Sequence, residues 1–553
     1  MPRLEVPLVD EKVRNPARAR SAAAVLDEAH VGDIRGAFGT IREHDRGSRR
    51  TWRQRLLALA AIMGPGLIVM VGDNDAGGVA TYAQAGQNYG SSLLWTLLLL
   101  IPVLIVNQEM VVRLGAVTGV GHARLIFERF GRFWGMFSVC DLFLLNFLTI
   151  VTEFIGVALG AEYFGVTPFA AVPVVAVLLI AITLSGRFEV WERMMFAFIV
   201  GNMLVLPMMF LSHPSAGDVV HDMFIPGFRG GFTSNAVLLV IAIVGTTVAP
   251  WQLFFQQSNV IDKRITPRWI PYERADTVIG AFVVVVGAAA IMITAAGAFN
   301  GTADSGQFVN AGTVAHGLQR HVSGALGAIF ATVLIDSSII GASAITLATS
   351  YAFGDVFGIR HSLHRPWHEA KPFYASFTAV VVLAAAIVLI PGAPLGLITT
   401  AVQALAGLLL PSASLFLLLL CNDREVLGPW INRPWLNALA SLILGVLLVL
   451  SLILVFTTIF PTIDVGVVVV ALGGVLVAGF AAIAYLLRGS VFSRARPTAV
   501  EQDRDTWRMP PIALLSRPRA SRGRQVALYA LSSYLVVAVL MLLVKAVQLA
   551  TGH

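Results

Sequence analysis

The sequence has few charged residues and almost no cysteine. Charged residues make up 13% of its 553 residues and hydrophobic residues 57%, with a mean hydropathy of +0.78. A soluble globular protein of this length needs a polar surface layer, so this composition excludes that class. The two cysteines, Cys140 and Cys421, lie in or beside apolar segments, so we expect no disulfide framework. The composition predicts a polytopic membrane protein.

The sequence also lacks the usual signatures of an enzyme. It has no phosphate-cradling glycine loop, no nucleophile elbow and no zinc-ligand spacing, and no nucleophile–base pair lies in an apolar segment. We therefore expect neither enzymatic activity nor a resident cofactor. The net charge of +7 does not indicate nucleic-acid binding, because the basic residues lie in loops between apolar runs, where they set membrane topology.

Apolar runs predict the membrane spans. Residues 1–54 are charged and polar and lack the apolar core of a signal peptide, which predicts a cytosolic N-terminal tail. A bilayer span needs about 20 apolar residues, and by that rule the rest of the chain holds about thirteen. We place them at 55–86, 91–112, 133–160, 167–185, 190–212, 235–260, 275–298, 325–351, 374–391, 395–420, 437–459, 464–487 and 526–548.

These spans divide the chain into regions. Two five-helix halves, 55–212 and 235–421, are followed by helices 11 and 12 over 437–487. A basic segment, 488–524, which we expect to be cytosolic and disordered, precedes a last helix over 526–548.

Arginine and lysine set the predicted orientation. They cluster after the second, sixth, eighth and twelfth spans, all on the side of the N-terminal tail, whereas opposite loops such as 213–233 and 299–324 are poorer in them. By the positive-inside rule the N-terminus is cytoplasmic. We expect a multi-pass protein of the cell (inner) membrane. The sequence sets no oligomeric state, and a monomer is compatible with it.

The first span contains acids beside glycines. Residues 64–78 read GPGLIVMVGDNDAGG. A charged side chain at membrane depth costs roughly 2.5–3.5 kcal/mol on insertion scales, so it usually marks an ion or substrate path. Adjacent glycines indicate an unwound helix, which survives in a membrane only where it lines a protected cavity. The pattern predicts an ion-binding site.

A second break lies five spans later. Residues 245–252 read GTTVAPWQ, and Pro250 removes a backbone donor in the middle of the sixth span. Breaks at corresponding places in two five-span halves are typical of inverted-repeat transporters, whose site forms at the midplane between the broken helices. The two breaks together predict a transporter.

The two broken segments resemble those of the Nramp divalent-metal transporters. In that family a GPG start precedes a DPGN motif at the spacing seen here, QAG follows as at 84–86, and MPHN stands where this chain has residues 249–252. Further matches over residues 55–430 are Arg113-Leu114-Gly115, Thr152-Glu153, Gln403, Pro411 and Asn422-Asp423-Arg424. The resemblance implies an all-α, LeuT-type fold with two inverted five-helix repeats, and a cation site between broken helices 1 and 6.

The resemblance also implies the site residues. Asp75 corresponds to the family's acidic ligand, and the carbonyls of Gly72 and Thr246 to its backbone ligands. Gln252, in place of an asparagine, would orient a coordinated water, and Gln403 matches a glutamine that approaches the ion when the site closes.

Two departures from the family pattern bear on the ion. Gly78 replaces an asparagine, and Ala249 replaces a methionine whose soft thioether favours transition metals. Both changes enlarge the cavity, and Mg²⁺ usually keeps several waters and is held by one or two carboxylates. The pattern resembles the Nramp-related magnesium transporter branch, and it predicts partly hydrated Mg²⁺ as the substrate, with Mn²⁺ tolerated.

Proton coupling is not expected. Where the relatives carry histidines and a further acid, this chain has Trp251, Gln256 and Gly156, and no histidine lies in a predicted span. Glu153 is the remaining acid there. We therefore expect uptake driven by the membrane potential, which supplies about 4.6 kcal/mol per 100 mV for two charges.

Several alternatives stay open. Asp75 could have a purely structural role, in which its carboxylate binds nearby backbone amides rather than the cation. Asp73 and Asn74 either line the vestibule, where Asn74 is a candidate metal ligand, or cap the second half-helix. Asp336, on an eighth span that faces the first helix, either attracts the cation or forms an internal ion pair. Asp73, Asp336 and Glu153 are thus candidates for the cation path.

Other residues and functions were weighed in the same way. Glu109 and Asp141 lie near span ends, and we expect them to pair with loop arginines. A proton-coupled Mn²⁺ or Fe²⁺ transporter and an organic-substrate carrier of the same fold are the alternative functions. An acid at the break would repel a substrate carboxylate, which disfavours the carrier. A non-transporting sensor is the third alternative.

Overall fold

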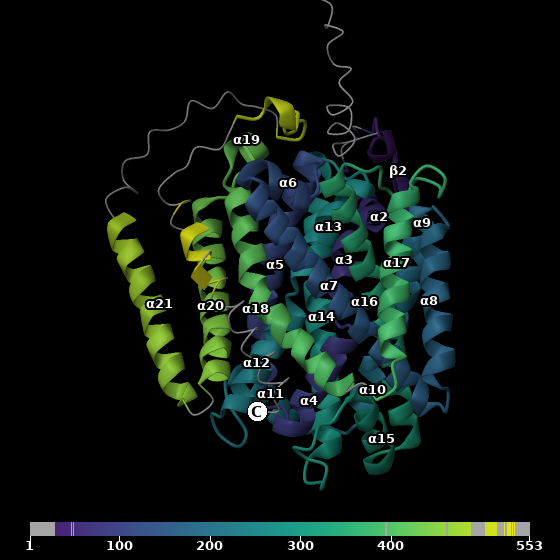
Figure 1. Ribbon diagram of the computed structural model, residues 1–553, viewed down its shortest axis with the longest axis vertical. Coiled ribbons are helices and arrows are strands. Elements are labelled where there is room, and N and C mark those ends of the chain that lie inside the picture. The colour runs from purple at the N-terminus through teal and green to yellow at the C-terminus, as the bar shows by residue number, and fades with distance from the viewer. Residues whose placement is uncertain are drawn as a thin grey trace, which may run out of the picture.

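The computed structural model describes residues 28–45, 47, 49–392, 395–460, 463–487 and 504–516, with isolated positions between 525 and 536. The described chain is a bundle of long α-helices with a single β-hairpin at one end (Figure 1). The hairpin pairs β1 (Ile34–Gly36) antiparallel with β2 (Gly39–Ile41). Most of the predicted last helix, 526–548, lies outside the described residues.

The long helices follow the predicted halves. The first half contains α3 (Pro65–Val71), α4 (Ala76–Tyr89), α5 (Leu94–Thr118), α7 (Arg132–Tyr163), α8 (Pro168–Leu184), α9 (Phe188–Asn202) and α10 (Val205–Leu211). The second contains α12 (Ser234–Thr247), α13 (Pro250–Asp262), α14 (Ile270–Phe299), α16 (Gly324–Phe357), α17 (Lys371–Val388) and α18 (Leu395–Cys421). Two more, α20 (Pro434–Ile459) and α21 (Val465–Leu487), come after the halves.

Shorter elements close the two ends of the bundle. One end carries the hairpin, α2 (Trp52–Ile62), α6 (His122–Phe130) and α19 (Arg424–Leu427), and the other carries α11 (Ala216–Phe224) and α15 (Ala311–His321) (Figure 1). Single 3-10 turns lie at Glu28–His30, Pro267–Trp269, Gly428–Trp430 and Ile512–Leu514.

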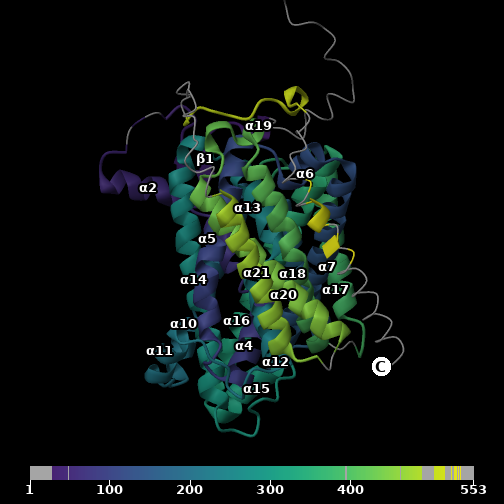
Figure 2. The ribbon, with the colours of Figure 1, turned by 90° about the vertical axis from the view of Figure 1, so that its left-hand side faces the viewer.

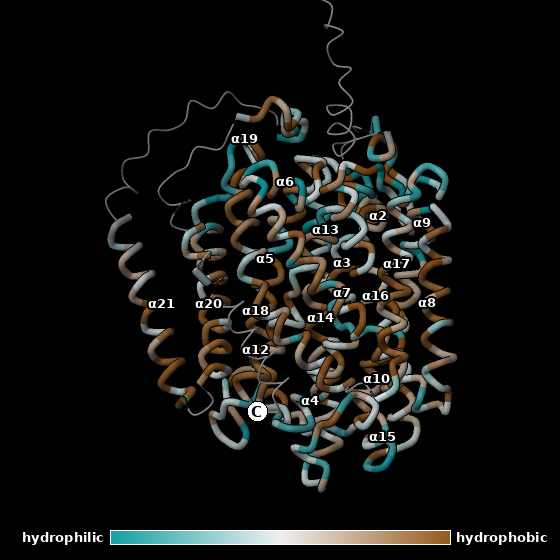
Figure 3. Tube along the Cα trace, viewed as in Figure 1, coloured by the Kyte–Doolittle hydropathy of each residue, from teal (hydrophilic) through white to brown (hydrophobic). Residues whose placement is uncertain are grey.

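The apolar residues form a band across the bundle. In Figure 3, hydrophobic residues colour the middle of the long helices and hydrophilic residues lie mostly at the two ends. Within the described residues, ten helices are long and apolar enough to cross a membrane, or eleven if one bent pair is counted as a span. Residues Ser234–Asp262 are 89% buried over their apolar window and Val465–Ala482 only 11%, so the broken sixth helix is central and α21 is peripheral.

The predicted first span, 55–86, is not one helix. Helix α2 turns by 57° relative to α3, and the chain breaks again before α4. Gly64 lies at φ 155°, which a side chain rarely allows, and Pro65 starts the next helix. Figure 2 shows α2 running crosswise to the long helices and projecting from the side of the bundle near the hairpin end.

Part of the basic segment 488–524 is packed, so the prediction of disorder is wrong for residues 504–516. The backbone N–H of Met509 donates to Val117 O at 3.2 Å, and the Trp430 indole donates to Arg504 O at 3.0 Å. The ring of Trp507 lies against Gly428. Aromatic side chains within the basic run explain why it docks. Residues 488–503 and 517–524 lie outside the described part.

Candidate functional site

The first helix break exposes backbone groups between α3 and α4. The break runs from Gly72 to Asp75, and Asp75 caps α4 by accepting from the Gly78 N–H at 2.7 Å. The Ala76 N–H donates to Glu153 Oε2 at 3.0 Å. In a continuous helix that N–H would bond to the Gly72 carbonyl. The carbonyl predicted to be a ligand therefore lacks its helical donor.

The second helix break likewise exposes backbone groups, here between α12 and α13. Val248 and Ala249 have non-helical backbone, and Pro250 begins α13. Because proline has no N–H, the carbonyl of Thr246 receives no bond from the residue four positions later. Ala249 is buried in this break. Both carbonyls expected to be ligands thus lie at helix ends opened by the sequence.

The two breaks face each other across Gly78. A Cβ at Gly78 would lie 2.8 Å from the Asp73 carbonyl oxygen and 3.4 Å from Thr246 Oγ1. Tyr82, one turn along α4, shares a 2.7 Å hydrogen bond with Thr247 Oγ1. Glycine is therefore what allows the first and sixth helices to approach so closely here.

Gln252 and Gln403 border the same region. The Gln252 side chain accepts from Gln108 Nε2 at 3.2 Å and donates to Thr247 O at 3.5 Å. The amide of Gln403, on α18, lies against Gly77, where a Cβ would overlap it. The structure thus brings the predicted glutamine of the tenth span beside the first break.

Glu153 lies directly beside Asp75. Both acids lie against Gly341 of α16. A Cβ at Gly341 would lie 2.7 Å from Glu153 Oε2 and 2.9 Å from Asp75 Cβ, so only a glycine leaves room for the two acids to approach each other here. Glu153 is fully buried and Asp75 is 2% exposed. Two carboxyl groups therefore meet at the N-terminus of α4, where backbone amides partly offset their charge.

Unpaired polar atoms surround the two breaks. Within the described residues, the buried atoms without a hydrogen-bond partner include Asp73 Oδ1 and Oδ2, Asn74 Oδ1, Glu153 Oε1, Thr246 Oγ1 and Gln403 Nε2. Buried polar atoms are normally bonded, since leaving one unpaired costs several kcal/mol in the worst case. All but one of these are oxygen acceptors. A cation is the partner that would satisfy them.

Positive side chains do not balance the acids here. In the described part of the chain, no Lys or Arg forms an ion pair with Asp73, Asp75 or Glu153. No cluster of three or more His, Cys, Asp or Glu side chains with metal-binding geometry occurs among the described residues. Any ion at the breaks would therefore be bound largely by backbone carbonyls and water.

One candidate ligand, Asn74, and one predicted path residue, Asp336, point elsewhere. Asn74 donates its amide to Val284 O on α14 at 3.1 Å, which turns it toward that helix. Asp336 lies against Gly201 of α9, whereas Ser338 lies against Gly156 near the first helix. We expected this part of the eighth span to face the first helix. Ser338 does so and Asp336 does not, because residues two positions apart on a helix point to nearly opposite sides.

The two acids near span ends, Glu109 and Asp141, have different partners. Glu109 pairs with Arg113 at 2.9 Å and with Arg274 at 2.5 Å, as predicted. Asp141 instead accepts from Ser412 Oγ at 3.2 Å and pairs with no described arginine, so that prediction is wrong. Ser412 follows Pro411 on α18, a contact between distant helices that no local pattern could reveal.

Sequence reasoning missed the supporting residues of the site. Tyr82, Gln108 and Gly341 hold the breaks and the two acids in place. Tyr82 follows Gly78 by four residues, so helical spacing could have placed it on the same face. Gln108 and Gly341 lie on other helices, and nothing in their local sequence signals their role.

A family model supports these observations. The model described as "Natural resistance-associated macrophage protein-like" matches residues 66–457. The chain is 28% identical over 446 residues to the divalent metal cation transporter MntH of Xylella fastidiosa (strain Temecula1 / ATCC 700964), which covers 77% of this chain and 89% of that protein. It is 26% identical over 421 residues to MntH of Latilactobacillus sakei subsp. sakei (strain 23K), with coverages of 72% and 90%.

Solved structures share the fold. A manganese transporter of Eremococcus coleocola, in complex with an aromatic bis-isothiourea substituted compound, superposes with a TM-score of 0.61 at 21% identity, covering 81% of this chain and 96% of that chain. A mutant of the same transporter gives a TM-score of 0.63 at 20% identity, with coverages of 82% and 98%. The predicted helical, LeuT-type transporter fold is therefore confirmed, and the helix breaks at residues 72–75 and 248–249 are consistent with it.

Proposed function

The chain belongs to the Nramp family, and from that premise we propose that it is a divalent metal cation transporter that imports partly hydrated Mg²⁺, and to a lesser extent Mn²⁺, by alternating access. The observation that carries the proposal is the group of unpaired, buried oxygen atoms where the two helix breaks face each other. The named relatives are divalent metal cation transporters, which fits the same ion class.

The donor set favours a hard ion. Asp75 offers a carboxylate, Gly72 and Thr246 offer carbonyls, and Ala249 supplies no sulfur. Carboxylate, carbonyl and water oxygens suit Mg²⁺ and Mn²⁺, whereas thioether sulfur favours softer metals. Mg²⁺ dehydrates reluctantly, so a site with few protein ligands suits its partly hydrated form.

The charge of the site favours a dication over an organic anion. Asp75 and Glu153 each accept one backbone amide of α4, whereas neither carboxylate oxygen of Asp73 has a hydrogen-bond partner in the described part of the chain. Within the described residues, the region therefore offers more acceptor oxygens than its hydrogen bonds use. A substrate carboxylate would be repelled, which disfavours an organic-substrate carrier.

Membrane-potential-driven uptake is proposed for the coupling mode. Trp251 and Gln256 replace the family's histidines, and Gln256 donates its amide to Thr277 Oγ1 at 2.9 Å. No histidine lies in the described spanning helices. The contact between Glu153 and Asp75 favours a second candidate, proton-coupled Mn²⁺ transport, because two adjacent carboxyl groups can share a proton.

Ion flux into proteoliposomes tests the proposal. We expect Mg²⁺ uptake by the wild type, loss of uptake in Asp75→Ala, and retained uptake in Asp336→Asn, a matched acid on α16 that faces α9. A non-transporting sensor would show no wild-type uptake. Loss of uptake in Asp336→Asn alone would move the site away from the breaks.

A pH-sensitive dye inside the vesicles decides the coupling. With the membrane potential clamped, we expect Mg²⁺ influx without acidification. Acidification that tracks metal influx under the clamp would reject passive uptake and favour the proton-coupled candidate. We place the N-terminus in the cytoplasm, because the arginine-rich ends lie with it, and vesicle-side-specific proteolysis of the tail would check this.

A further inference from the structure

A cavity of about 300 Å³ lies at the arginine-rich end of the bundle, where α5, α14, α20 and residues 504–516 meet. Its basic and aromatic lining residues are Arg113, Arg274, Arg433, Arg504, Trp430 and Trp435. One acid, Glu109, also lines it, and the remaining lining side chains are apolar. The lining thus combines surplus positive charge with an apolar wall.

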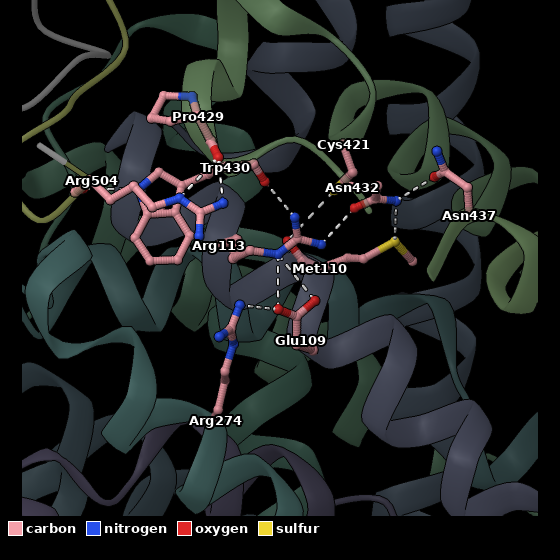
Figure 4. A network of polar contacts seen from close by, with 10 residues as sticks. All are labelled: Glu109, Met110, Arg113, Arg274, Cys421, Pro429, Trp430, Asn432, Asn437 and Arg504. Atoms are coloured by element: carbon pink, nitrogen blue, oxygen red, sulfur yellow. Dashed lines mark hydrogen bonds and ion pairs between the residues drawn. The ribbon is translucent and has the colours of Figure 1, made fainter. Parts of the chain in front are cut away.

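Arg113 is structural in this cavity. It is 3% exposed, and each of its three guanidinium nitrogens donates a hydrogen bond: Nε to Glu109 Oε2 at 3.0 Å, Nη1 to Trp430 O at 2.5 Å and Nη2 to Asn432 Oδ1 at 2.6 Å (Figure 4). These bonds fix the turn that carries Trp430. The floor of the cavity is therefore rigid.

The other three arginines keep donors available. Arg274 pairs with Glu109 at 2.5 Å, but its buried Nε has no partner among the described residues. Arg504 lies 5.1 Å over the Trp430 ring and donates to Pro429 O at 2.7 Å (Figure 4). Arg433 is exposed and forms no ion pair with a described residue. Glu109 offsets one charge, so an anion would find unneutralised arginines here.

The cavity also touches the apolar band. Ile105, on α5, and Leu436, on α20, line its wall, and Trp435 at the start of α20 is 60% exposed. Tryptophan is enriched where membrane spans meet the headgroup region. Figure 3 shows that α5 and α20 continue from this end into the hydrophobic middle of the bundle. A ligand here would meet arginines on one side and apolar side chains on the other.

We propose that this cavity binds the headgroup of an anionic phospholipid, such as phosphatidylglycerol, from the leaflet at the arginine-rich end. The phosphate is held by Arg274, Arg433 and Arg504, and the first acyl carbons lie along Ile105 and Leu436. Basic pockets between membrane helices recognise anionic headgroups by this combination of charge and position. Inorganic phosphate would satisfy the arginines but leave the apolar wall unused.

A lipid in this cavity would bind two distant parts of the chain at once. Arg504 belongs to the C-terminal segment and Arg274 to α14, which packs along both halves of the broken first helix. Lipid binding therefore stabilises the docking of residues 504–516 and α20 onto the transport helices. The inference is independent of which ion the protein moves.

The test titrates lipid into the purified protein in a neutral detergent and follows the thermal unfolding midpoint. We expect phosphatidylglycerol to raise the midpoint and phosphatidylcholine or inorganic phosphate to leave it unchanged. Each of Arg433→Gln and Arg504→Gln should raise the lipid mole fraction needed for half the shift about fivefold, as expected for loss of one arginine near a headgroup. Arg360→Gln, an exposed arginine at the same end, is the matched control and should change nothing.

Each other result rejects the proposal. An equal shift with phosphatidylcholine shows a non-specific lipid effect. The full shift with inorganic phosphate alone shows a free-anion site. An unchanged phosphatidylglycerol titration in both Arg433→Gln and Arg504→Gln places any lipid effect outside this cavity.

Discussion

A buried ion pair connects the N-terminal hairpin to the start of the broken first helix. Lys263, at the end of α13, donates to Glu192 Oε1 at 2.5 Å and to the Met63 carbonyl at 2.7 Å. The other oxygen of Glu192 accepts from the Ala37 N–H, in the hairpin, at 2.5 Å. Lys263 and Glu192 are both fully buried. This pair is the basis for a quantitative prediction.

Replacing one partner leaves the other charge buried without compensation. We expect Lys263→Met to lower the free energy of unfolding by about 3–5 kcal/mol, the usual cost of breaking a buried pair. Glu192→Gln keeps only one acceptor oxygen for two donors, Lys263 and the Ala37 N–H, and it leaves the buried Lys263 charge unpaired, so we expect a loss of about the same size, about 3–5 kcal/mol. The double variant should lose less than the sum of the two, because no isolated charge is left.

Denaturant unfolding of the detergent-solubilised protein gives the three free energies. Hydrogen exchange then reports where the loss acts, and we expect Lys263→Met to speed exchange at residues 34–41 and 63–67. A loss below about 1 kcal/mol, or strictly additive single losses, would refute the reasoning that the pair is desolvated and coupled. Lys371→Met, at the exposed start of α17, is the control for removing a lysine.

Three further predictions concern the site and the pH response. Ala249→Met should shift flux preference from Mg²⁺ toward Mn²⁺ by about tenfold, equivalent to about 1.4 kcal/mol, in competition assays, and an unchanged ratio would contradict the soft-ligand argument. Gly77→Ala should displace Gln403 and lower flux about tenfold without unfolding, and a second change, Gln403→Ala, should add nothing further. Burial lowers the pKa of His361, but the hydrogen bond and charge of Asp355, 3.2 Å away, outweigh it and leave that pKa above its ordinary value. A raised histidine pKa stabilises the fold below about pH 6.5, and this stabilisation is lost as the pH rises through the folded-state pKa. The thermal unfolding midpoint of the wild type should therefore fall over that pH range. The midpoint of His361→Gln should depend less on pH over the same range.

The helix breaks could be predicted because their causes are local. Glycine residues and the missing N–H of a proline disturb a helix within one turn of their own position. The breaks at residues 72–75 and 248–249 can therefore be predicted from the sequence. The bend at Gly64 was not predicted, because its positive φ depends on contacts at the end of the bundle. The sequence also did not predict which side of the eighth span faces the site, because Asp336 lies against α9 instead.

Long-range contacts explain the other differences. Residues 504–516 are basic, which favours a solvated segment. Trp507 nevertheless packs against Gly428, 79 residues earlier, and the Met509 N–H donates to Val117 O on α5, 392 residues earlier. Glu153 could be named as a candidate, yet its contact with Asp75 depends on the small Gly341 of another half of the chain. Sequence patterns give the chemistry of such residues, and packing decides whether they meet.

Asp75 shows why a structural role does not exclude an ionic one. It caps α4 through the Gly78 N–H, as the alternative interpretation required, and it also lies beside Glu153, whose Oε1 has no hydrogen-bond partner among the described residues. Asparagine caps a helix about as well as aspartate but carries no charge. Asp75→Asn should therefore keep the unfolding free energy within about 0.5 kcal/mol of the wild type while abolishing Mg²⁺ flux. If Asp75→Asn still transports at the wild-type rate, the cap is its whole role, and the cation must be held by Asp73 and Glu153 instead.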